Sequence, residues 1–222
     1  MRAAVVVLVL TTSSVAQAGV QDWDFGAVVS YDFRYLRLAQ DNAIGDLHEV
    51  MDAGLGGRGF AGKGAAGIAV GFDVHMGGGL DGGFAHEANL YPLGYGVKLG
   101  TWGFVGAVTG VGVSGVTDRI PFGWQLPVET FVEFDLGKRF HLNVASSYRW
   151  IGAADERQTE HGATPDEHTM RMDLRFNRQH NRYGFAAGNG YYVGFYSVDR
   201  MDETFYGIAI GYAVHTISSG HR

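Results

Sequence analysis

Acidic and basic side chains recur at every second position along several segments, alternating with apolar residues. These are the residues whose types allow chemistry. Buried charges of mixed sign need one another as partners. If the segments enclose an interior, we expect their charged faces to form a lumen charge network of Asp32, Arg34, Asp73, His75, Glu129, Glu133, Asp135, Arg139, His141, Arg149, Arg171, Asp173 and Arg175.

A catalytic reading requires a nucleophile, a base and an orienting carboxylate that converge. Asp73 and His75 share one face, and the pair His86-Glu87 lies close to a connection. His48, His161 and His168 lie in or near predicted loops rich in carboxylates. None of these spacings identifies a reaction, so we expect no enzymatic activity, no catalytic residue and no cofactor.

The best candidate for a metal site is Glu160-His161 together with Asp166-Glu167-His168. It has no closed set of ligands at a recognisable spacing. Solvated loop polarity is the simpler interpretation, and we predict no metal. The glycine runs at 54–57 and 77–79 lack the Lys-Ser/Thr that a phosphate loop requires.

Composition excludes several classes of protein. The 222 residues include 35 Gly, which disfavours an all-helical fold, and 46% hydrophobic residues, which disfavours disorder. There is no Cys, so disulfides, thiolate metal sites and a lipid on an N-terminal Cys are excluded. A net charge of -6 without a Lys/Arg-rich run argues against nucleic acid as a partner.

Period-two alternation is the main structural signal. Tyr206, Ile208 and Ile210 alternate with small residues, as in a strand with one large and one small face. The alternating runs predict about ten strands, or eight if the short third and fourth runs are merged or discarded. Their ranges are 24–37, 63–76, 79–88, 93–100, 102–114, 127–136, 139–151, 168–177, 183–198 and 204–215.

The ends and connections indicate location. Residues 1–18 have Arg2, an apolar core and Ala16-Gln17-Ala18, as in a secretory signal peptide, so residues 19–222 are expected to form one domain. The uncharged run 99–117 could nearly span a membrane as a helix, but its glycine and β-branched content favours a strand. We predict long connections at 39–62, 114–126 and 152–167, all on one rim.

The distribution of charge separates two all-β folds. A transmembrane barrel places polar faces inside and apolar faces outside, whereas a secreted soluble sandwich does the reverse. Aromatic residues near the strand ends suit interfacial girdles, namely Trp23, Phe33, Tyr35, Trp102, Phe104, Phe140, Trp150, Tyr191 and Tyr192. We therefore favour a closed antiparallel up-and-down transmembrane barrel, with Val132, Phe134, Leu142, Val144, Ile208 and Ile210 facing outward.

On this pattern the chain resembles small bacterial outer-membrane β-barrel proteins, although it carries no family-specific motif. The resemblance implies an outer-membrane location after cleavage near Ala18 and contact with membrane lipid. We expect a structural or surface-interaction role with a charge-filled or narrow lumen, and extracellular or envelope partners at the long loops. The alternatives are a narrow porin-like pore and a secreted soluble protein that binds an apolar ligand.

Overall fold

Ten antiparallel strands close into one barrel in the computed structural model of this chain. The structure describes residues 23–38, 49–63, 65–79, 83–99, 103–116, 120–136, 140–152, 166–177, 190–200 and 203–219. The strands are β1 Trp23–Leu38, β2 Glu49–Lys63, β3 Ala66–Gly79, β4 Phe84–Lys98, β5 Gly103–Val116, β6 Ile120–Asp135, β7 Phe140–Gly152, β8 Glu167–Asn177, β9 Gly190–Arg200 and β10 Glu203–Ser219.

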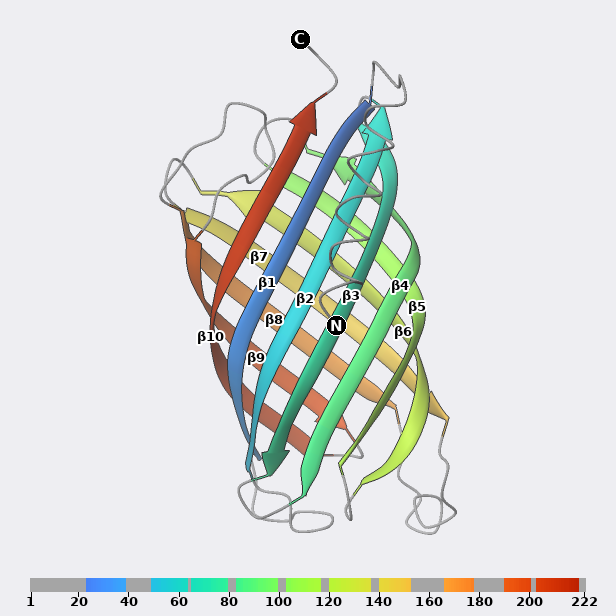
Figure 1. The fold of residues 1–222 in the computed structure, drawn as a ribbon, viewed down its shortest axis with the longest axis vertical. Helices are drawn as coiled ribbons and strands as arrows, with labels where there is room; N and C mark the ends of the chain where they lie inside the picture. The colour runs from blue at the N-terminus through green and yellow to red at the C-terminus, as the bar shows by residue number, and fades with distance from the viewer. Residues whose placement is uncertain are drawn as a thin grey trace, which may run out of the picture.

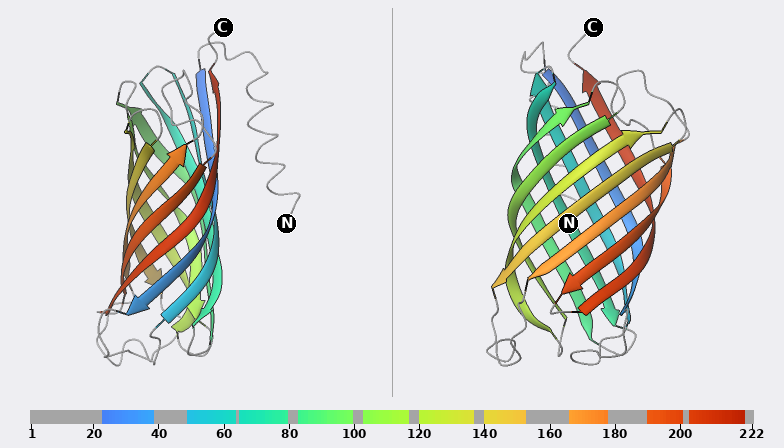
Figure 2. Two further views of the ribbon diagram at one scale, coloured as in Figure 1. Left: turned by 90° about the vertical axis from the view of Figure 1, so that its left-hand side faces the viewer. Right: turned by 180° about the vertical axis from the view of Figure 1, so that it is seen from behind.

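Each strand pairs with its neighbours in the sequence, and β1 closes the barrel by pairing with β10 from Asp24↔Ser219 to Leu38↔Phe205. The strands are tilted around a common axis (Figures 1 and 2). We call the end with Trp23 and Ser219 the terminal rim, and the end with Leu38 and Glu203 the opposite rim. Closure gives every strand two hydrogen-bonded neighbours, so no unpaired edge meets the lipid.

The predicted strand number is confirmed, but two of the predicted elements were wrong. Residues 49–62, expected within a long loop, belong to β2, and the runs 79–88 and 93–100 both overlap the single strand β4. In β4 the register shifts between Leu90 and Leu93, with the exposed Pro92 in this irregular stretch. A β-bulge interrupts the alternation of side chains, so it makes one strand read as two.

The glycines of β2 hide its alternation. A Cβ on Gly54 would lie 2.3 Å from Asp32 Oδ1 and 2.4 Å from the His75 ring, and one on Gly57 would lie 2.6 Å from the Phe72 ring. Side chains of the neighbouring strands β1 and β3 therefore occupy the space above these glycines. The side chains that cover these positions belong to the neighbouring strands, so the sequence of β2 alone does not show the alternation of a strand.

The predicted loop pattern holds only in part. The connections after β1, β5 and β7 do reach the opposite rim, as expected. However, β6 begins at Ile120, which leaves only 117–119 between β5 and β6, and another long connection, 178–189, joins strand ends at the terminal rim. Long connections therefore occur at both rims.

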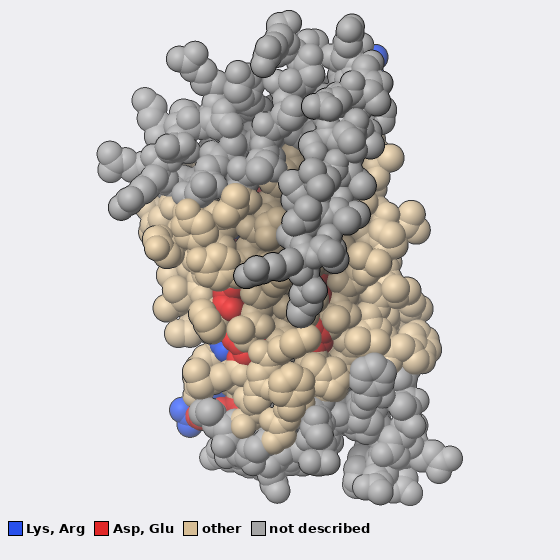
Figure 3. Space-filling model, viewed as in Figure 1, with Lys and Arg blue, Asp and Glu red and all other residues tan. Residues whose placement is uncertain are grey.

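The barrel carries apolar side chains outside and charged side chains inside. Phe33 is 70% exposed and Ile210 60%, whereas Asp32 is 4% and Asp173 0% exposed. Lys, Arg, Asp and Glu occupy only small areas of the face drawn in Figure 3. This is the arrangement of a transmembrane barrel, and it overturns the alternative of a soluble sandwich, whose charges would lie outside. In the described ranges, no helix is long and apolar enough to cross a membrane.

The aromatic girdles were predicted correctly for some residues and wrongly for others. Phe33, Phe140, Trp150 and Tyr191 are exposed on the outer wall. Tyr192 and Phe104 are instead buried inside the barrel. Adjacent residues of a strand face opposite sides, so Tyr191 and Tyr192 cannot both meet lipid. The side chains of Trp23 and Trp102 lie outside the described part of the chain.

Two apolar clusters fill opposite ends of the interior. One lies toward the terminal rim and contains Phe60, Ala69, Tyr91, Phe104, Val108, Phe131 and Ala145. The other lies toward the opposite rim and contains Leu36, Val50, Tyr196, Val198, Phe205 and Ala209. The two clusters draw on different parts of the wall.

A charge placed on the outer wall tests the orientation. Ile210 lies near the middle of β10. We therefore expect the substitution Ile210→Arg to lower the free energy of unfolding by about 2–4 kcal/mol in lipid vesicles. Tyr206→Arg, on the same face nearer the rim, should cost about 0–1 kcal/mol. Denaturant titration would measure both. Equal costs at the two positions would contradict a membrane-embedded outer wall.

Candidate functional site: the charged lumen

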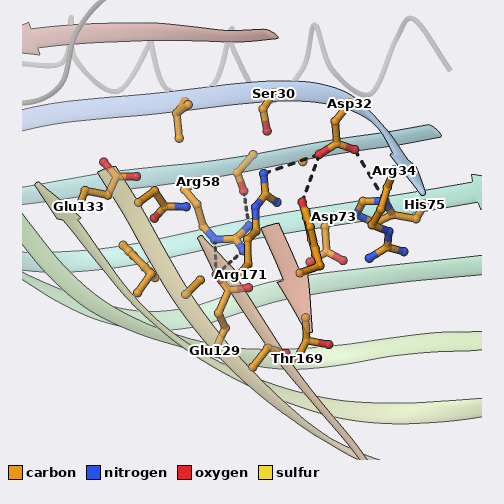
Figure 4. Close-up of a pocket in the computed structure, with 18 of the residues that line it drawn as sticks. Ser30, Asp32, Arg34, Arg58, Asp73, His75, Glu129, Glu133, Thr169 and Arg171 are labelled. Carbon is orange, nitrogen blue, oxygen red and sulfur yellow. Dashed lines mark hydrogen bonds and ion pairs between the residues drawn. The ribbon is translucent and has the colours of Figure 1, made fainter. Parts of the chain in front are cut away.

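Ion pairs in the interior join strands that are not neighbours in the sheet. Arg58 of β2 reaches across to Glu129 of β6, with its Nε 3.0 Å from Glu129 Oε1. Arg149 of β7 lies 2.6 Å from Glu87 of β4 and also pairs with Glu167 of β8. Figure 4 shows Arg58 and Glu129 directed toward each other across the interior. These pairs fill the centre of the lumen with side chains.

Arg34, Asp52 and His75 form a second group, contributed by β1, β2 and β3. The Arg34 guanidinium donates to the Asp52 carboxylate in a bidentate pair, with distances of 2.8 Å from Nη2 and 3.1 Å from Nε. His75 Nδ1 lies 3.3 Å from Asp52 Oδ1 and 3.9 Å from Asp32 Oδ1. Bidentate geometry fixes the Arg34 side chain, because two parallel hydrogen bonds define its plane.

A third group surrounds the buried carboxylates of Asp32 and Asp173. Tyr192 donates to Asp32 at 2.6 Å, and Arg171 donates to Asp173 at 2.7 Å. Arg171 also lies 3.6 Å from Asp32, which links the two carboxylates. The guanidinium carbon of Arg171 is 5.2 Å from the centre of the Tyr196 ring. The Arg171 cation thus makes a cation–π contact with an aromatic ring inside the lumen.

Amides extend the network between the charged groups. Asn89 donates to Asp73 and to Glu87, both at 2.8 Å, and Gln125 donates to Asn89. Asn143 donates to Asp173 at 3.1 Å. The carboxylates of Asp73, Glu87 and Asp173 thus accept hydrogen bonds from amides, which helps to offset the burial of their charge.

Two cavities lie among the described side chains of the lumen. One of about 70 Å³ is lined by residues including Ser30, Arg58, Glu129 and Arg171 (Figure 4). The other, of about 90 Å³, lies toward the opposite rim beside Ser114, Glu167 and Phe205. Arg34 and His75 line both cavities and stand between them. Such volumes hold a few water molecules each.

Most of the predicted lumen residues are found inside the barrel. The buried ones are Asp32, Arg34, Asp73, His75, Glu129, His141, Arg149, Asp173 and Arg175, and Glu133 and Arg171 are half-buried there. Arg175 lies 3.6 Å from Glu133. Asp135 ends β6, but its side chain is outside the described part, as is Arg139 altogether.

Several residues of the lumen were missed in the sequence. Asp52 and Arg58 lie in β2, which was expected to be a loop. Glu87 was placed in the run 79–88 close to a connection, and Glu167 in the connection 152–167, but both face inward, from β4 and β8. A signal was available for Glu167, because it continues the alternation of Thr169, Arg171 and Asp173 toward the start of the strand.

The candidate metal cluster is not assembled by the described residues. Glu167 faces the lumen and pairs with Arg149, whereas His168 lies on the outer wall. No group of three or more potential metal ligands occurs in the part of the chain that the structure describes. Glu160 and His161 lie outside that part.

Comparison with known proteins identifies no family. No family model matches the chain, and no curated protein matches it. Among solved structures, the NanC porin aligns with 81% of this chain and 98% of its own at 7% identity and a TM-score of 0.45. The KdgM porin aligns with 82% of this chain and 98% of its own, at 13% identity and a TM-score of 0.35. The CymD monoaromatic hydrocarbon channel aligns with 89% of each chain, at 8% identity and a TM-score of 0.37. With TM-scores below 0.5, these similarities add nothing to what the barrel itself shows.

The resemblance to small outer-membrane barrels is confirmed by the architecture. Ten antiparallel strands close the barrel, its outer wall is apolar and its interior is charged. These three properties together are those of an outer-membrane β-barrel.

Removing a charge from the lumen should lower the free energy of unfolding far more than removing a charge from the rim. Asp173→Asn keeps the shape of a fully buried side chain but leaves Arg171 without its nearest carboxylate, so we expect a loss of about 3–5 kcal/mol in unfolding free energy. Glu49→Gln is the control, because its partner Arg37 is 70% exposed. That change should cost about 1 kcal/mol or less. A cost for Asp173→Asn as small as the control's would show that the lumen charges are solvated.

Proposed function

We propose that this chain is an outer-membrane barrel with a lumen closed by its own side chains, serving as a structural or surface-interaction protein of the envelope. The observation that carries the proposal is the pairing across the interior of strands that are not neighbours, Arg58 of β2 with Glu129 of β6 and Arg149 of β7 with Glu87 of β4. The two cavities that lie beside these pairs in the described part of the chain are about 70 and 90 Å³, which supports a lumen without a wide path for solutes. Contact with partners would then fall to the outer surfaces and to the connections at the rims.

Export is part of this proposal. Residues 1–18 have the order of a secretory signal, and cleavage near Ala18 would leave 19–222 as the mature barrel domain. The exposed apolar wall supports a membrane destination, because water would not solvate such a surface. The partner we assign with most support is therefore membrane lipid.

Fractionation tests location and processing together. We expect the protein in the outer-membrane fraction, with a different gel mobility before and after boiling, because a closed barrel resists detergent until heated. N-terminal sequencing of the extracted protein should begin at Gly19. Recovery in the soluble fraction would contradict the membrane assignment, and an intact N-terminus would contradict the cleavage site alone.

Conductance tests the closed lumen. In planar bilayers we expect the wild-type barrel to give current close to baseline. The double variant Arg58→Ala/Glu129→Ala removes one connection across the lumen, so its current should rise above that of the wild type. The matched control, Arg37→Ala/Glu49→Ala, removes an exposed pair near the opposite rim and should leave the current unchanged.

A narrow channel is the second candidate. It is favoured by the two cavities, which approach each other at Arg34 and His75. A steady wild-type current well above baseline would support the channel and overturn the closed lumen. Current from none of the variants would leave the closed lumen in place and show that other pairs suffice to block it.

A further inference from the structure

A serine, a histidine and an aspartate are in contact on the outer wall, away from the charged lumen. Ser146 of β7 places its Oγ 3.0 Å from Nε2 of His168 on β8. The other ring nitrogen of His168, Nδ1, lies 3.7 Å from Asp199 Oδ2 on β9. The three side chains come from three neighbouring strands and are far apart in the sequence.

The register of the sheet explains this convergence. His168 pairs directly with Asp199 across β8 and β9, and with Tyr148 across β7 and β8. Ser146, two residues from Tyr148 on the same face, is its diagonal neighbour. Diagonal side chains on one face of a sheet remain within reach of a long side chain such as histidine.

The aspartate is held in place by a further residue. Thr204 of β10 donates to Asp199 Oδ1 at 2.7 Å, while Oδ2 faces His168. Thr204 and Asp199 are direct partners in the register of β9 and β10. The carboxylate is thus oriented by one neighbour and directed at the imidazole by the other.

The order of contacts is that of an activated serine. A serine nucleophile needs a histidine nitrogen to accept its proton, and the opposite ring nitrogen needs a carboxylate that selects the tautomer and stabilises the imidazolium. Such arrangements are recognised by geometry and roles, whatever the fold. Hydrogen-bond distances at such sites are often long before the substrate binds.

We propose that Ser146, His168 and Asp199 form a hydrolase site for carboxylic acyl esters of membrane lipids. His168 is the second residue of β8 and Asp199 the last but one of β9, so the site lies on the outer wall near the opposite rim. The side chains of His168 and Asp199 are 38% and 50% exposed, which leaves them open to a lipid at this level.

The surroundings favour an amphiphilic ester. From the site toward the middle of the barrel, the outer faces of β8 and β9 carry Met170, Met172 and Phe195, which are 51%, 44% and 51% exposed. An acyl chain can lie along these side chains, as it does along the rest of the apolar wall. Tyr148 and Trp150, whose rings are 4.8 Å apart, mark the interface at the rim side.

The reaction balances with water as the second reactant. Ser146 Oγ attacks the ester carbonyl carbon and gives its proton to His168 Nε2. The carbon–oxygen bond to the alcohol breaks, and His168 returns the proton to the leaving alkoxide. Water then attacks the acyl-serine with His168 as base, which releases the carboxylic acid and restores Ser146.

Thr130 is the candidate donor to the oxyanion. It pairs directly with Ser146 across β6 and β7, and its hydroxyl lies 3.4 Å from the Ser146 carbonyl oxygen. From this position the hydroxyl can turn toward an ester oxygen held at Ser146. Thr130→Val should therefore lower kcat while leaving the barrel folded.

A covalent probe tests the nucleophile directly. The full chain, folded in detergent micelles, is incubated with a fluorophosphonate bearing an alkyl chain, and the labelled peptide is identified by mass spectrometry. We expect labelling at Ser146, lost in Ser146→Ala and in His168→Ala. Ser197→Ala is the matched control, because Ser197 shares the outer face on β9 and is not part of the triad. It should label like the wild type.

Hydrolysis tests the reaction and the source of the ester. One arm uses mixed micelles of a diacyl glycerophospholipid, and the other uses an acylated glucosamine glycolipid; released fatty acid is measured in both. We expect turnover in at least one arm and a fall of at least about 10³-fold in Ser146→Ala. Asp199→Asn should lower kcat by about 10²-fold or more with KM little changed, as for a positioning residue.

Two results would overturn the proposal. One is fluorophosphonate labelling that is absent from Ser146 while the protein shows its heat-dependent gel shift, which proves that the barrel is folded. The other is fatty-acid release in neither arm, or release unchanged by Ser146→Ala. In either case the three residues form only a polar group at the membrane interface. Neither result depends on whether the lumen is open or closed.

Discussion

Charges enclosed by a membrane barrel must find their partners inside it. The outer wall of this chain is apolar, so a buried carboxylate or guanidinium must find its partner within the lumen. Asp173, with no exposed surface, is bonded by Arg171 and Asn143, and Asp32 accepts from Tyr192. The ion pairs Arg58–Glu129 and Arg149–Glu87 join strands that are not neighbours in the sheet. The contacts that make burial of charge possible are therefore also the ones on which the proposed closed lumen rests.

Two apolar clusters also occupy the interior. Tyr91, Phe104 and Phe131 fill the interior toward the terminal rim, whereas Leu36 and Phe205 fill it toward the opposite rim. The glycines of β2 leave room for neighbouring rings and for the Asp32 and His75 side chains. Large inward side chains are therefore accommodated by small residues on the adjacent strand. What remains is a pair of cavities with Arg34 and His75 between them.

The two faces of β7 and β8 carry different chemistry because successive residues of a strand face opposite sides. Ser147 and Glu167 face the lumen, and Glu167 pairs there with Arg149. Ser146 and His168, one residue away in each strand, contact each other on the outer wall. A single sheet thus separates an ionic interior from a polar group of the membrane interface. The hydrolase proposed for the outer face requires nothing of the lumen.

The sequence by itself determined the fold class, the strand number and the inward side of most charges, since alternation is a local property and membrane burial demands one apolar face. It did not predict β2, whose glycines are covered by side chains of β1 and β3, and its alternation predicted two strands in place of the bulged β4. The sequence also did not predict which side chains pair with one another. Which carboxylate meets Arg58, and that Ser146, His168 and Asp199 converge, depends on closure and register. Those are set by pairing between distant segments, so only the tertiary structure decided them.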